Sequence, residues 1–70
     1  MSGFDILSAL QAVRLPKGVR WINSAFDGQN VIATLAYGLE EPSYALVTCD
    51  DESKAQAVVA KALIELGASG

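Results

Sequence analysis

The stretch VRWINSAFDGQNVIATLAY, residues 19–37, decides the fold. It contains two runs rich in β-branched and aromatic residues, 19–26 and 31–37, on either side of Asp27-Gly28-Gln29-Asn30. An Asp-Gly pair between two such runs is a strong local signal for a tight hairpin. We therefore predict two antiparallel strands joined by this turn.

A third strand is expected over residues 43–49, because Gly38 and Pro42 mark a turn after the hairpin and a run of similar length follows. Three consecutive strands with short loops form a meander. Neither face of the second and third strands shows the clean alternation of a sheet with one solvated face. This pattern predicts that the second face is at least partly covered.

One helix is expected before the meander and one after it. Over residues 3–13 the apolar residues fall on one broad helical face, and Pro16 with Gly18 ends that segment. Residues 51–66 follow helical spacing again. The acidic run 50–52 lies where the free N–H groups of a helix start favour negative charge, and Gly67 lies where a left-handed cap is usual.

The predicted fold class is therefore α+β, with the order α-β-β-β-α: a three-stranded antiparallel meander with two helices packed on one face. Residues 1–70 are expected to form a single domain. Two helices on one face would leave the other face of the sheet for a partner. The expected core residues are Leu7, Leu10, Ile22, Leu35, Leu46, Val58, Val59, Ala62, Leu63 and Leu66.

The composition of the chain reduces the number of function classes to consider. The chain is 51% hydrophobic, with a mean hydropathy of +0.31, which is high for 70 residues and predicts that some apolar surface meets a partner. No window approaches the ~18 apolar residues of a membrane span, and no positive charge precedes the first apolar stretch, so we expect a cytoplasmic chain. With Cys49 as the only cysteine and no histidine, we expect no intrachain disulfide, metal or cofactor, no evident small-molecule substrate and no enzymatic activity.

Charged residues suggest one candidate surface. The net charge of −3 disfavours nucleic acid and favours a basic partner. In a meander, Asp27 and the run Asp50, Asp51 and Glu52 fall at the same end of the sheet. These carboxylates either recognise a basic protein surface or simply serve the turn and the helix start. Their spacing matches no calcium-binding loop.

A second candidate surface lies on the back of the second helix. Ser53, Ala57, Ala60 and Ile64 recur at helical spacing opposite the core stripe. Such a flat, weakly polar ridge suits packing against another chain, including a second copy, although it also fits an ordinary exposed helix surface.

The order of elements is similar to that of the double-stranded-RNA-binding domain, and residues 62–66, Ala-Leu-Ile-Glu-Leu, resemble the end of that family's second helix. In that family the start of this helix carries lysines that meet phosphates. Aligned on Ala62-Leu63, those positions here hold Asp51, Glu52 and Ala55. No RNA-binding residue is carried over.

We expect a small non-enzymatic protein–protein interaction module. It either self-associates as a homodimer or acts as an inhibitor or adaptor of the type carried by phages and mobile elements, with an acidic face on a basic target surface. Two alternatives stay open: a structural subunit of a larger assembly, and a degenerate RNA-binding module. The second would use the chain's five basic residues, Arg14, Lys17, Arg20, Lys54 and Lys61.

Overall fold

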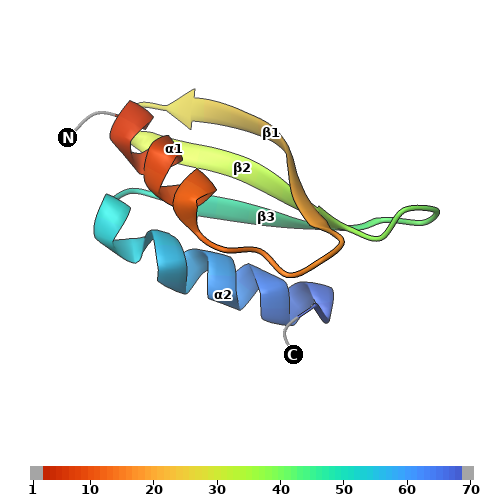
Figure 1. Ribbon diagram of the computed structural model, residues 1–70. Coiled ribbons are helices and arrows are strands. Elements are labelled where there is room, and N and C mark those ends of the chain that lie inside the picture. Colours follow the sequence, from red (N-terminus) through yellow and green to blue (C-terminus); the bar gives the residue numbers. More distant parts are fainter. Residues whose placement is uncertain (1–2, 69–70) are drawn as a thin grey trace.

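The computed structural model describes residues 3–68 and has the predicted order of elements (Figure 1). The helix α1 spans Gly3–Ala12, and the strands β1, β2 and β3 span Val19–Asp27, Asn30–Tyr37 and Ser43–Cys49. A 3₁₀ turn, η1, spans Glu52–Lys54 and leads directly into α2, Ala55–Leu66. The predicted α-β-β-β-α order is confirmed.

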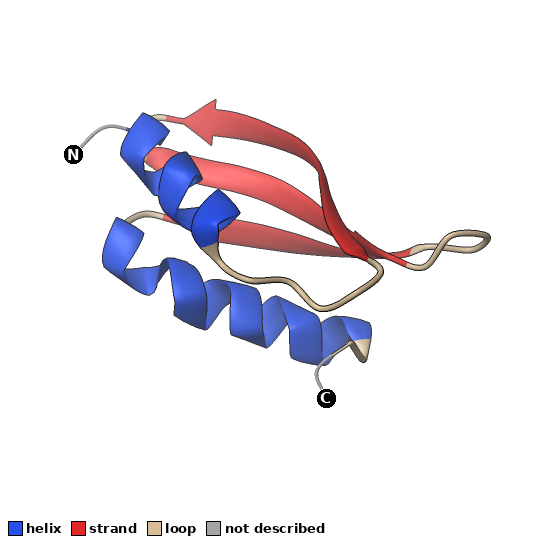
Figure 2. Cartoon of the chain, in the orientation of Figure 1, coloured by secondary structure: helices blue, strands red, loops and turns tan. Residues whose placement is uncertain are grey.

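The three strands form an antiparallel sheet in the order β1-β2-β3. Asp27 pairs with Asn30, so Gly28 and Gln29 form a two-residue hairpin loop in which Gly28 takes a φ of 63°. A positive φ at this position suits glycine, which explains why the Asp-Gly pair marks the turn. The β2–β3 loop, Gly38–Pro42, projects beyond the sheet as an extended tip (Figure 2).

Both helices lie on one face of the sheet, as predicted, and we call this the inner face (Figures 1 and 2). β2 and β3 contribute Val31, Leu35, Ala45, Val47 and Cys49 to the core cluster on that face. The helices contribute Ile6 and Leu10 from α1, and Ala55, Val59, Ala62 and Leu66 from α2. The opposite face, which we call the outer face, carries no helix formed by residues 3–68.

The prediction of a core position is wrong for two residues. Leu46 is 65% exposed and Ile22 is 45% exposed. In the β2–β3 register Leu35 pairs with Ala45, so the inner face takes Ala45 and Leu46 turns outward beside Thr34. A β-bulge between Trp21 and Asn23 leaves Ile22 as the extra, unpaired residue. The other predicted core residues are buried or packed against the core.

The ends of the second helical segment are set by local hydrogen bonds. Asp51 is in an extended conformation, and its carboxylate accepts a bond from the backbone N–H of Ser53 at 3.0 Å. The backbone N–H of Lys54 donates to the carbonyl of Asp51, three residues earlier, at 3.0 Å, so the first turn is 3₁₀ rather than α. At the other end Gly67 has a φ of 72°, and the N–H groups of Gly67 and Ala68 donate to the carbonyls of Ile64 and Leu63. These two hydrogen bonds together form a Schellman cap, as Gly67 at this position predicts.

Candidate interaction surfaces

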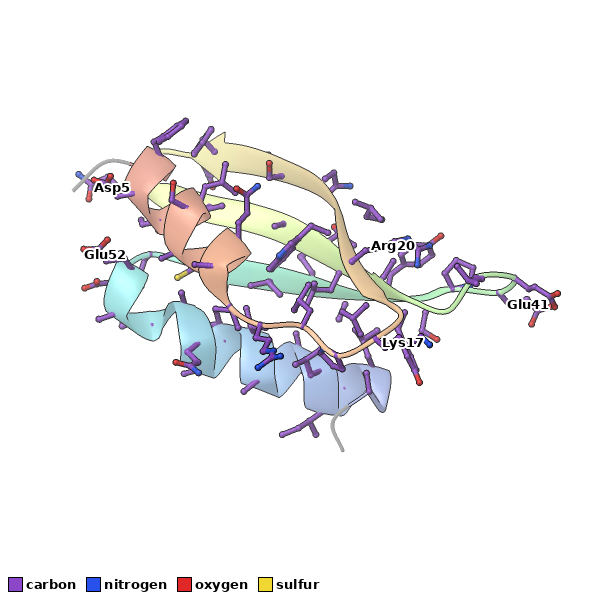
Figure 3. The ribbon with its side chains drawn as sticks, viewed as in Figure 1. Asp5, Lys17, Arg20, Glu41 and Glu52 are labelled. Atoms are coloured by element: carbon purple, nitrogen blue, oxygen red, sulfur yellow. The ribbon has the colours of Figure 1, made fainter. Side chains whose placement is uncertain are left out.

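The structure brings the predicted acidic residues to one end of the sheet. Asp27 ends β1, and the pairing of Val31 with Cys49 puts the segment after β3 beside the β1–β2 turn. Asp5 and Glu52 lie at this same end, whereas Lys17, Arg20 and Glu41 lie at the opposite one (Figure 3). The molecule therefore has an acidic end, which we define as Asp27, Asp50, Asp51 and Glu52.

Two members of the acidic end already have local partners. Asp51 caps η1, and the Ser53 N–H holds the pKa of the Asp51 carboxyl below its ordinary value of 3.8. Asp50 forms an exposed ion pair with Lys54 at 3.1 Å, and this hydrogen bond raises the pKa of Lys54. Within residues 3–68 no three Cys, Asp or Glu side chains are close enough to hold a metal ion. The local role predicted for Asp51 is thus confirmed.

The back of the second helical segment is exposed. Ser53 lies in η1, and Ala57, Ala60 and Ile64 share one face of α2. All four are exposed, and the Ile64 side chain is 67% accessible. They lie away from the buried stripe of Ala55, Val59, Ala62 and Leu66, as the spacing predicts.

The outer face of the sheet is a surface that the sequence analysis did not assign to named residues. Tyr44 and Leu46 on β3 are 61% and 65% exposed, and Ile22 projects from the bulge of β1. On β2, Thr34 lies half-buried opposite Leu46, and Ile32 lies half-buried opposite Thr48. One signal in the sequence points to this surface. Strands ending at 37 and starting at 43 pair residue 35 with residue 45, which sends Leu46 to the opposite face from Leu35.

The basic residues around the α1–β1 connection, Arg14, Lys17 and Arg20, do not act as one group. The Arg20 guanidinium donates to the carbonyl of Gly38 at 3.0 Å and so ties β1 to the start of the β2–β3 loop. Arg14 instead borders a hollow of about 400 Å³ between α1 and the start of the second helical segment, together with Glu52 and Ser53. Trp21 packs against the core with its indole N–H buried and unpaired.

Cys49 is buried at the end of β3. Its thiol donates a hydrogen bond to the carbonyl of Asp51 at 3.0 Å.

A groove of about 240 Å³ runs between β3 and α2. Residues 46–48 border it on the strand side. On the helix side it is bordered by Val58, Lys61, Ala62 and Glu65. The groove is therefore lined by both apolar and polar groups, with one cationic and one anionic side chain on the α2 wall.

Neither described helix has the length and apolar character that crossing a membrane requires. Comparisons of the chain with known protein families, with curated proteins and with solved structures give no match.

Proposed function

We propose that this chain is a non-enzymatic protein–protein interaction module that binds through the outer face of its sheet. The observation that carries the proposal is the exposure of Tyr44 and Leu46 on a face that neither described helix covers. Large apolar side chains gathered on one surface mark contact sites more often than isolated exposed ones do. Aromatic residues are also enriched at the centres of such contacts.

The size of the chain is consistent with this role. A standard interface covers about 800 Å² of each partner, which is about one sixth of the 4588 Å² surface of this chain (800/4588). Covering Leu46 alone contributes about 1–2 kcal/mol of apolar burial.

A narrower form of the proposal is an inhibitor or adaptor of the phage or mobile-element type, whose acidic end occupies a basic surface on its target. The separation of the acidic end from Lys17 and Arg20 supports it, because oppositely charged surfaces steer association. In this form the acidic end orients the partner and the outer face supplies the apolar contact.

The RNA-binding alternative has weaker support. Lys54 is paired with Asp50, and Arg20 is bonded to a backbone carbonyl. Arg14 shares its hollow with Glu52. Three of the five basic side chains thus lie beside an acceptor or an acid, which works against phosphate contacts.

Site-specific crosslinking tests the proposal. A photoreactive amino acid at Ile22, in the chain expressed in its native host, is expected to yield a crosslinked protein adduct. The matched control carries the same group at Gln11, which is exposed on α1. Equal yields at the two positions, or no adduct at Ile22, would overturn binding through the outer face.

A further inference from the structure

The two edges of the sheet differ in how they are protected. β1 has a bulge and carries the charged residues Arg20 and Asp27. β3 has no charged residue, proline, glycine or bulge, and pairs with β2 without a break from Ser43 to Cys49. Bulges and charges prevent edge strands from pairing with other chains. β3 lacks these protections and presents a free row of backbone donors and acceptors.

The groove beside this edge carries its own charge pattern. Lys61 and Glu65 lie one turn apart on the α2 wall. Within residues 3–68 neither side chain has an ion-pair partner. A partner that fits here supplies an uncharged extended strand together with an acid opposite Lys61 and a base opposite Glu65.

A second copy of the chain meets these conditions. β3 is itself an uncharged strand rich in residues that favour extended structure. Two identical edge strands form a regular closed pair when they run antiparallel about a two-fold axis perpendicular to the sheet. If this axis passes midway between Leu46, the middle residue of β3, and its copy, the two α2 helices also lie antiparallel to each other.

The position of the groove then fixes which charges meet. Leu46 borders the same groove as Lys61 and Glu65, so an axis through Leu46 passes α2 close to this turn. Lys61 of one copy faces the partner's Glu65, and the symmetric pair forms on the other side of the axis. Lys61 and Glu65, which have no ion-pair partner within residues 3–68 of one chain, therefore each gain a partner of opposite charge in the dimer.

We propose that the chain forms a two-fold dimer through antiparallel pairing of its β3 edges, which gives one six-stranded sheet. This inference goes beyond the proposed function, because the second copy pairs along the β3 edge and leaves the outer face free. The dimer joins the two outer faces into one surface, with Leu46 beside its copy at the centre.

Sedimentation equilibrium of the purified chain and of two charge variants tests the dimer. Lys61→Glu places an acid against the partner's Glu65, and Glu65→Lys places a base against the partner's Lys61. Each variant alone is expected to associate about tenfold more weakly than the wild type. An equimolar mixture of the two variants restores both attractive pairs and is expected to recover wild-type association.

The inference would be overturned if the wild type stayed monomeric at all concentrations up to about 1 mM, which is well above the dissociation constant of a typical dimer. So would a dimer that neither variant weakens, or a mixture no tighter than its components. Glu52→Lys, at the acidic end, is the matched control and should leave the dimer intact. Fluorescence of Trp21, the only tryptophan, verifies that each variant is folded. An adduct at Ile22 with a different protein, together with a monomeric wild type, would leave the proposed function standing without the dimer.

Discussion

The inner and outer faces of the sheet are built from the same three strands but have different surroundings. On the inner face Leu35 and Val47 are almost completely buried beneath the two helices. On the outer face Tyr44 and Leu46 are mostly exposed, although Leu46 is adjacent to Val47 in the sequence. On β3 both faces carry apolar side chains, Ala45 and Val47 inward and Tyr44 and Leu46 outward, so hydrophobicity alone does not determine burial on this strand. The side on which the helices pack determines it.

The largest expected effect is at the centre of the inner face. Leu35→Ala is expected to lower the free energy of unfolding by about 2–5 kcal/mol, because it leaves a cavity in a closed core. A 70-residue domain has a total stability of roughly 4–10 kcal/mol, so this variant is close to unfolding. Leu46→Ala, on the outer face, is expected to cost less than about 1 kcal/mol. Urea unfolding followed by circular dichroism, at a concentration where the chain is monomeric, compares the two; equal losses would mean that the faces are not distinct.

A smaller effect is expected from an isosteric pair at adjacent positions. Val47→Thr buries a hydroxyl group beneath α2 and is expected to cost about 1–2 kcal/mol. Thr48→Val makes the reverse change on the outer face and is expected to stay within about 0.5 kcal/mol of the wild type. Thermal unfolding midpoints of both variants measure the difference. A loss for Thr48→Val as large as that for Val47→Thr would contradict the assignment of faces.

The smallest expected effect on stability is at Asp51, which caps the start of the second helical segment. This segment packs on the inner face only. The pKa of Asp51 is lowered in the folded chain by the Ser53 N–H, so its ionised form stabilises the fold above pH ~4. That contribution is lost as the pH falls through the folded pKa. Asp51→Asn keeps a capping oxygen but removes the titration.

Melting temperatures of the wild type and Asp51→Asn are therefore expected to converge between pH 5 and pH 2, with Asp27→Asn as the comparison variant. These pH limits bracket the ordinary carboxyl pKa of about 4. A constant difference across this range would rule out titration of Asp51 as a source of acid sensitivity.

Local signals in the sequence were sufficient to predict the elements. The Asp-Gly turn, the break at Pro16 and the cap at Gly67 each act within a few residues, and each predicted boundary agrees with the structure to within about one residue, apart from the 3₁₀ turn at Glu52–Lys54. The acidic end followed from meander topology alone, which brings Asp27 beside the segment after β3.

The faces were harder to predict because the pattern on β3 is apolar on both sides. Leu46 is larger than Ala45 and Cys49, so size alone favours Leu46 for the core, whereas the register set by the β2–β3 loop places the smaller residues there. The bulge at Ile22 has no local signal, since Trp21 and Ile22 are both large and apolar. Both errors concern long-range pairing, which is also what creates the apolar outer face.

The buried thiol of Cys49, at the end of β3, allows local opening of the chain to be measured by thiol labelling. Because Cys49 is enclosed and bonded to the carbonyl of Asp51, a thiol reagent reaches the sulfur only when the junction between β3 and η1 opens. The labelling rate divided by that of a free thiol therefore gives the equilibrium constant for this opening. Protection that rises with protein concentration would show that association closes the same junction, without any change to the sequence.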